Sequence, residues 1–202
     1  MAVITNYATL QTAVADYLAR SDLTAYIPNF IQNAENKLYR TLNLRNEETA
    51  LSVSITSGVA AVPSDFKALK FAYYDHSPVQ LLQWMGVSSL YERFPVRSVA
   101  TTPTAIAREG SNFIFGAAAA DGTLKGIYYA KQGFARDIDT TWYVTDAPDV
   151  LLYAALLEAA PFIKDDARLP IWQGFFNEAV LGLKEEERNS SVSKDNLSVT
   201  AF

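Results

Sequence analysis

The hydrophobic pattern of the chain changes its period twice, and this limits the possible folds more than any other feature. Apolar side chains recur at helical spacing before about residue 45 and after about residue 146. Between these points they alternate with polar ones, as in half-buried strands. A helix with one apolar face must bury that face against a partner. The two ends of the chain are therefore predicted to pack together, with the β-rich middle inserted between them.

This organisation predicts an α+β fold: a helical bundle built from the N- and C-terminal helices, with an inserted small antiparallel β-domain and an extended C-terminal tail. We expect residues 1–45 and 146–188 to form the bundle, residues 46–145 the β-rich inserted domain, and residues 189–202 an extended C-terminal arm. Four helices, two from each end, would make the bundle.

The first 45 residues are predicted to form two helices. An apolar stripe that starts at Tyr7 and ends at Leu18 indicates the first, with Thr5 or Asn6 able to cap it. A second stripe extends from Ile27 to Leu42, and Pro28 falls in the first turn of that helix, where its missing N–H costs little.

The middle of the chain has the alternation and the turn residues of short strands. Asp121-Gly122 is the strongest turn signal, because this pair tolerates positive φ. Between two of the strands, residues 87–94 are predicted to form a short helix capped by Ser88 or Ser89. The predicted strands are residues 51–56, 59–63, 66–74, 78–82, 104–108, 112–115 and 123–130.

Helical spacing returns after residue 145. We expect Asp146 to cap a helix that has Pro148 and Asp149 in its first turn. Residues 151–157 are apolar nearly all round, which predicts the most buried helix of the protein. In the last helix, an aromatic face is expected to lie in the bundle core; it contains Trp172, Phe175 and Phe176.

The composition argues against most enzyme classes and against general nucleic-acid binding. The 202 residues include no Cys and one His, which excludes thiolate chemistry, zinc fingers and His-pair metal sites. The chain has 17 basic and 22 acidic residues, so its net charge is −5. This charge opposes general binding to nucleic acids, which depends on basic side chains that neutralise the phosphates. No stretch is long and apolar enough to cross a membrane, because residues 150–163 are too few and include Glu158 and Pro161.

The remaining candidates for chemistry have simpler structural explanations. The triplet Asp75-His76-Ser77 cannot form a relay, because adjacent side chains on a strand point to opposite faces. Neither Asp165-Asp166 nor the Asp137 and Asp139 pair has the spacing of a metal loop. The glycines form no phosphate-binding motif. We therefore expect no catalytic residue, no metal and no cofactor.

The C-terminal arm is the one feature that packing and capping do not explain. It places apolar side chains among serines, and such tails often dock by adding a strand to a partner or by filling its pockets. We expect this arm to bind a partner through Val192, Leu197, Val199 and Phe202.

The motifs and their order resemble those of the head-to-tail adaptor (connector) proteins of tailed bacteriophages, best known from short-tailed phages. The resemblance covers about residues 5–187 and is most specific over residues 141–166. Val62 to Phe66 resembles the family's turn into a strand. The residues of this sequence that carry the resemblance are Pro28, Phe30, Ala34, Glu35, Pro63, Asp65, Trp142, Pro148, Asp149, Tyr153, Asp165 and Asp166.

The resemblance implies a structural protein of the virion, made in the host cytoplasm and placed at the head–tail junction. Such adaptors form a twelve-fold ring beneath the portal protein, contact neighbouring adaptor subunits, and dock the tail nozzle or other tail proteins. DNA would pass through the ring without sequence-specific binding, and no membrane would be involved. The C-terminal arm would grip the portal. Two alternatives stay open: a different tail or nozzle component or a soluble partner-binding domain, and a small enzyme.

Overall fold

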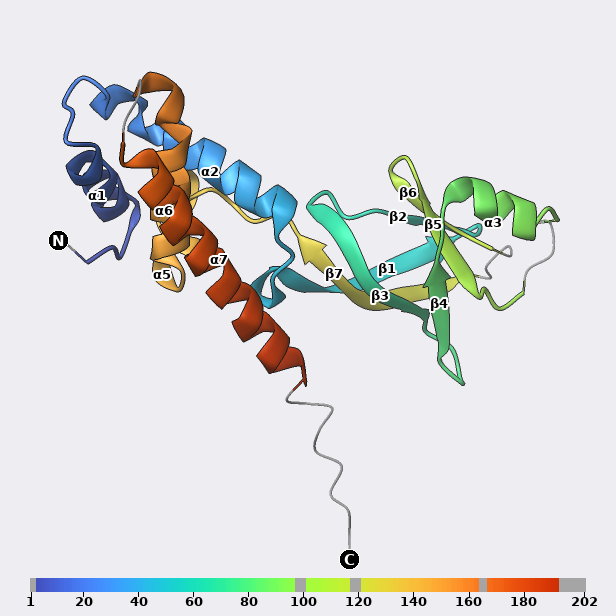
Figure 1. The fold of residues 1–202 in the computed structure, drawn as a ribbon. Helices are drawn as coiled ribbons and strands as arrows, with labels where there is room; N and C mark the ends of the chain where they lie inside the picture. The colour runs from blue at the N-terminus through green and yellow to red at the C-terminus, as the bar shows by residue number, and fades with distance from the viewer. Residues whose placement is uncertain (1–2, 97–100, 117–120, 164–166, 193–202) are drawn as a thin grey trace, which may run out of the picture. The chain divides into compact units, whose positions relative to one another are not determined.

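The structure is a computed structural model that describes residues 3–96, 101–116, 121–163 and 167–192. The chain divides into two compact units (Figure 1). The helical unit comprises Met1–Asn43 and Gln132–Phe202, and the barrel unit comprises Leu44–Lys131. Residues 132–145, which the sequence analysis grouped with the strands, are thus part of the helical unit and contain the short helices α4 (Ala135–Ile138) and α5 (Trp142–Thr145).

Helix α1 (Tyr7–Leu18) begins at a reciprocal pair of hydrogen bonds. The Thr9 amide donates to Oδ1 of Asn6 at 2.9 Å, and the Asn6 amide donates to Oγ1 of Thr9 at 3.0 Å. This capping box satisfies two of the amides that a helix start leaves without partners. Of the two caps that the sequence allowed, Asn6 is therefore the one used.

Replacing Asn6 with Ala is expected to lower the free energy of unfolding of the helical unit by about 1 kcal/mol, because the Thr9 amide loses its acceptor. Urea denaturation followed by circular dichroism at 222 nm would measure the loss. Thr12→Ala is the matched control, because the Thr12 hydroxyl bonds only the Ala8 carbonyl within the helix. An equal loss in both variants would contradict the capping role.

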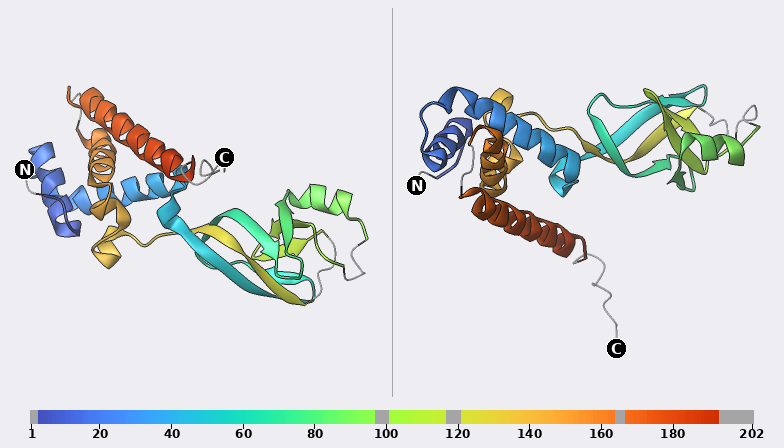
Figure 2. Two further views of the ribbon diagram at one scale, coloured as in Figure 1. Left: turned by 90° about the horizontal axis from the view of Figure 1, so that it is seen from below. Right: turned by 45° about the horizontal axis from the view of Figure 1, so that its top comes forward.

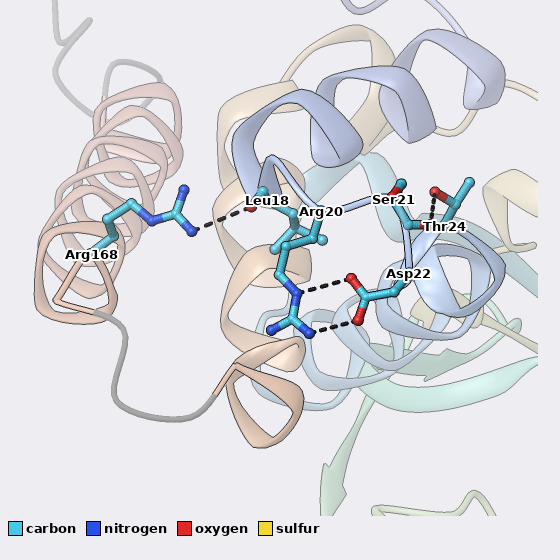
Figure 3. A network of polar contacts seen from close by, with 6 residues as sticks. All are labelled: Leu18, Arg20, Ser21, Asp22, Thr24 and Arg168. Atoms are coloured by element: carbon cyan, nitrogen blue, oxygen red, sulfur yellow. Dashed lines mark hydrogen bonds and ion pairs between the residues drawn. The ribbon is translucent and has the colours of Figure 1, made fainter.

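The end of α1 is held by an arginine that is distant in the sequence. Arg168 donates to the carbonyl of Leu18 at 3.3 Å (Figure 3). It also donates to the carbonyl of Tyr17 at 2.8 Å, and its guanidinium lies over the Trp172 ring. A cation at this place complements the negative end of the helix and satisfies carbonyls that have no partner in the helix. In the turn that follows α1, the Arg20 guanidinium donates two hydrogen bonds to the carboxylate of Asp22.

The other helices of this unit surround α6 (Pro148–Glu158). Helix α2 (Ile27–Thr41) follows a single turn, η1 (Thr24–Tyr26), and α7 (Leu169–Val192) follows another, η3 (Ala160–Phe162). Helices α1, α2, α5 and α7 all contact α6. The buried apolar side chains of α6 lie on every side of it, as its sequence predicted: Val150, Leu151, Leu152, Ala154, Ala155 and Leu156.

The barrel unit contains seven strands in the closed order β1-β2-β6-β5-β4-β3-β7. Its interior is filled by Phe113, Phe115, Ile106 and Leu124, all without exposed surface. Outside the barrel, α3 (Val87–Arg93) covers a smaller cluster of Leu90, Ala107 and Ile114. The strands are β1 (Glu48–Thr56), β2 (Val59–Ala61), β3 (Phe66–Tyr74), β4 (Gln80–Trp84), β5 (Ala105–Glu109), β6 (Asn112–Phe115) and β7 (Gly122–Ala130), and a single turn, η2 (Arg45–Glu47), precedes them.

The predicted fold class was wrong, because the β-region is a closed seven-stranded barrel rather than a small antiparallel appendage of a helical bundle. Closure depends on a parallel pair between β4 and β5, where Gln83 faces Ala105 and Trp84 faces Ile106. Parallel neighbours need a crossover, and α3 supplies it. The helices also do not form a four-helix bundle, since they are arranged around α6.

Three local predictions were also wrong. Helix α3 begins after Gly86 without a side-chain cap, so neither Ser88 nor Ser89 caps it. Helix α6 begins after Ala147, and Asp146 instead accepts a hydrogen bond from the Thr145 hydroxyl. The side chain of Phe175 is 46% exposed rather than in the core, whereas that of Trp172 is buried.

Candidate interaction surfaces

The described ranges contain no group of three or more His, Asp and Glu side chains that could hold a metal. His76 lies on the exposed turn between β3 and β4, and its ring stacks on Tyr74 with centroids 5.9 Å apart. Asp137 and Asp139 are exposed at and just after α4, and Asp139 adopts a φ of 61°. The site of this protein must therefore be sought among its surfaces and its packed polar groups.

The sequence-signature residues of α2 serve mainly to pack the helix. Pro28 occupies the first turn, as predicted, and Phe30 and Ala34 are buried. The Phe30 ring contacts that of Phe162 in η3, with centroids 5.1 Å apart. These residues join α2 to the segment that precedes α7.

Glu35 is different, because it is a carboxyl group with no exposed surface. Its Oε1 accepts a hydrogen bond from the Ala135 amide at 3.0 Å, where the chain has just returned from the barrel unit. Its Oε2 has no hydrogen-bond partner among the described residues. One turn later on α2, the Tyr39 hydroxyl donates to the Gly133 carbonyl at 3.0 Å. Glu35 and Tyr39 therefore tie residues 133–135 to α2.

Two further polar groups lie in the same environment. The buried hydroxyls of Tyr7 and Thr141, like Oε2 of Glu35, make no hydrogen bond of ordinary geometry with the described residues, although the Thr141 hydroxyl lies near Glu35. Burial raises the pKa of Glu35 to about 7; the Ala135 amide and the nearby Thr141 hydroxyl oppose the rise, and the nearby Asp137 charge adds to it. Burial likewise raises the pKa of the Tyr7 phenol. We refer to Tyr7, Glu35, Ala135 and Thr141 as the Glu35 cluster.

In the barrel unit, Asp65 of the Pro63–Asp65 turn fixes the end of the last strand. Its carboxylate accepts a hydrogen bond from the Tyr128 hydroxyl at 2.9 Å, and its backbone carbonyl accepts one from the Lys131 amide at 2.6 Å. Pro63 is half-buried and its carbonyl accepts from Phe66 at 3.1 Å. The turn is thus a structural element of the barrel.

The signature residues at the start of α6 and before it are also structural. Trp142 is half-buried and makes an edge contact with Tyr143 in α5. Pro148 and Asp149 occupy the first turn of α6, as predicted. Tyr153 stacks on Phe175 of α7 with centroids 5.3 Å apart. Asp165, Asp166, Leu197, Val199 and Phe202 lie outside the described residues, and Val192 is the last residue of α7.

A groove of about 640 Å³ lies between α2 and α7, over α6 and η3. The ion pair between Lys37 and Glu158 lies on its wall. No sequence pattern indicates this groove, because it arises where α2 packs beside α6 and α7, which follow it much later in the chain. Its lining comprises Lys37, Leu38, Thr41, Ala154, Leu157, Glu158, Ala160, Leu169, Pro170, Gln173 and Phe176.

Both units expose large apolar side chains. On α7, Ile171, Phe175 and Leu181 are exposed, at 56%, 46% and 61%. On the barrel, Leu81 of β4 is 65% exposed and faces Tyr73 of β3, whose ring stacks on Phe71.

Comparison with known protein families shows which family the chain belongs to. The model of the family described as SU10 adaptor protein matches residues 5–196, which span both units. The chain belongs to this family. Members of the SU10 adaptor family are phage head–tail adaptor proteins, which confirms the resemblance found in the sequence. A search of curated proteins found no match.

Membership in the SU10 adaptor family gives the chain a structural role in a phage particle and an association with other head and tail proteins. Within the described ranges, no helix combines the length and the apolar character that crossing a bilayer requires.

Proposed function

We propose that this chain forms a ring of twelve copies between the portal and the tail, extends the channel through which DNA passes, and docks the nozzle or another tail protein. The observation that carries this proposal is the family match, which extends over both units rather than over one shared motif. A ring of identical copies needs two different faces on each subunit, one for each neighbour.

The distribution of charge supports a channel that does not hold DNA. The helical unit contains 15 acidic and 9 basic residues, whereas the barrel unit contains 7 and 8. The negative charge of the chain therefore belongs to the helical unit. Binding to a phosphate backbone requires clustered basic side chains, so DNA would slide past this unit rather than bind it.

The arm beyond α7 is proposed as the portal attachment. Helix α7 continues to Val192, so the ten residues that follow it, 193–202, are the segment to test. If extended, they would reach about 35 Å from the end of α7. Leu197, Val199 and Phe202 supply the apolar side chains for pockets on the portal.

The test is to mix the chain with the portal protein of the same genome and to measure the mass of the complex by native mass spectrometry. Twelve copies on one portal ring are expected for the full chain. A chain that ends at Val192 is expected to keep its helical content and thermal midpoint but to lose at least about tenfold in portal affinity. Equal binding by the shortened chain would refute the arm as the attachment, whereas no binding by the full chain would refute the position next to the portal.

A further inference from the structure

The barrel unit has one strand edge that is open to a partner. Strand β1 pairs with β7 over Glu48–Ile55, but it pairs with β2 only at Ile55 and Thr56. Across the described residues, nothing pairs with residues 48–54 on the side away from β7, and β1 forms the border of the three-stranded part of the barrel (Figure 2, left). The backbone N–H and C=O groups on this border therefore have no strand to bond.

The opposite border of the same three strands is protected in ways that β1 is not. Strand β3 pairs with β4 only from Ala72 to Tyr74, so its earlier residues are also at a border. There, two register shifts interrupt the ladder between β3 and β7. Lys67 and Lys70 of β3 are engaged in ion pairs with Glu47 and Glu48. Such irregularities are a usual means by which proteins keep an edge strand from pairing with another chain.

Strand β1 has none of these protections. Its register with β7 is continuous, and between Thr49 and Thr56 it contains no charged residue, no proline and no glycine. Ala50, Ser52 and Ser54 are exposed on one face, whereas Leu51 and Ile55 are buried on the other. A regular, uncharged edge next to a protected one indicates that β1 has a partner.

We infer that the edge of β1 over residues 48–54 accepts an extended, uncharged strand from the tail protein that docks on the barrel unit. This inference rests on the proposed function, which assigns the portal to the arm and leaves the barrel unit for the tail. A partner strand would gain main-chain hydrogen bonds along the edge. Strand alternation then sets its chemistry: apolar side chains on the face of Leu51 and Ile55, and small or hydroxyl side chains on the face of Ser52 and Ser54.

An uncharged partner is required because the charged residue of this edge, Glu48, already pairs with Lys70, and residues 49–54 carry no charge that could compensate another. A lysine or a carboxylate on the inner face of the added strand would be removed from water beside Leu51, which is buried, and Val53, which is half-buried. The C-terminal arm of the chain has a comparable alternation at residues 197–201, so the test must also detect an arm that occupies the edge itself.

Hydrogen exchange measured by mass spectrometry tests the inference in three samples: the full chain alone, the chain that ends at Val192, and the portal–adaptor–tail assembly purified from intact virions. Alternate amides of an edge strand point outward, so about three amides in residues 49–54 should exchange at least about a hundredfold more slowly in the assembly than in the full chain. Unchanged exchange would overturn the inference. The inference would also be overturned if these amides exchanged slowly in the full chain alone and rapidly in the chain that ends at Val192, because the arm would then occupy the edge.

A pair of variants tests the same edge by binding. Ala50→Lys with Ser54→Lys places charge along it, and Ser111→Lys, in the exposed turn between β5 and β6, is the control. The double variant is expected to weaken tail attachment at least about tenfold while the control does not. Equal tail attachment by the double variant overturns the edge inference alone. Absence of the wild-type chain from virions would instead overturn the proposed function together with it.

Discussion

Replacing Glu35 with Gln is expected to make the stability of the helical unit independent of this residue's charge. The wild-type unit is expected to lose stability between pH 4.5 and pH 7, and the variant is expected to lack that loss. The pKa of Glu35 rises from 4.5 to about 7 in the folded protein, so the folded state holds its proton more tightly than the unfolded state does. The resulting stabilisation is complete below pH 4.5, declines as the pH rises, and is gone above about pH 7. It amounts to up to about 3 kcal/mol.

Urea denaturation at a series of pH values would measure this effect. Trp84 is the barrel's only tryptophan, so a Trp84→Phe background leaves Trp142 and Trp172 to report on the helical unit by fluorescence. In the Glu35→Gln variant, the amide oxygen can still accept from the Ala135 amide but the side chain cannot ionise, so the stability should lack the decline. An equal decline in both proteins would show that Glu35 does not cause it.

The control for this experiment is Glu178→Gln on the exposed part of α7. The side chain at this position lies in water and is not part of the Glu35 cluster, so the pH dependence of stability should match that of the wild type. Loss of the decline in the control would indicate a general charge effect on the acidic helical unit rather than a property of the Glu35 cluster.

Replacing Gly126 with Ala is expected to destabilise the barrel unit by about 3 kcal/mol. Small-to-large substitutions in a packed region cost most when the backbone has to move to make room. Gly126 lies in β7, between Leu51 of β1 and Ala72 of β3. A Cβ there would come within 2.2 Å of the Phe71 carbonyl oxygen and 2.8 Å of the Ala72 Cα. Both contacts are with backbone, so no side chain can rotate away to relieve them.

Thermal and urea unfolding of the Gly126→Ala variant, followed by the fluorescence of Trp84 with Trp142 and Trp172 replaced by Phe, would measure this loss. Gly174→Ala is the matched control, because a Cβ at that exposed position of α7 would meet nothing within 4 Å. Alanine there should leave the unfolding of the barrel unit, which Trp84 reports, unchanged, because its gain of about 0.5 to 1 kcal/mol in helix propensity belongs to the helical unit. A barrel that stays fully stable with the Gly126→Ala change would show that β3 can move away from β7.

Much of the secondary structure could be predicted from the sequence, because periodicity records which side chains are buried. The predicted bounds of the first helix match α1, and the alternation of Leu51, Val53 and Ile55 matches β1. Alternation gives the face of a strand but not its neighbours. The closure of the barrel depends on the β4–β5 pair, which joins two strands that are separated by a helix.

The prediction was least accurate where local signals compete. Asp146 has the residue type of a helix cap, yet Ala147 occupies that position and leaves Asp146 to bond Thr145. Phe175 shares the spacing of the buried Trp172, but α7 packs along a narrow stripe and exposes it. The role of Glu35 was also not apparent, since burial of a carboxyl beside the Ala135 amide is a tertiary contact between residues far apart in the chain.

The pairing of Glu48 with Tyr129 has a consequence for how adaptors of this kind can diverge. Because these residues are partners on adjacent antiparallel strands, the chain enters and leaves the barrel unit at neighbouring points. A short Gly- and Ser-rich turn from Asn43 to Gln132 should therefore close the helical unit without the barrel, and a barrel with other surface loops should be graftable at the same place. If the barrel unit docks the tail protein, as proposed, tail specificity would be exchanged between phages as a cassette while the helical unit stays unchanged.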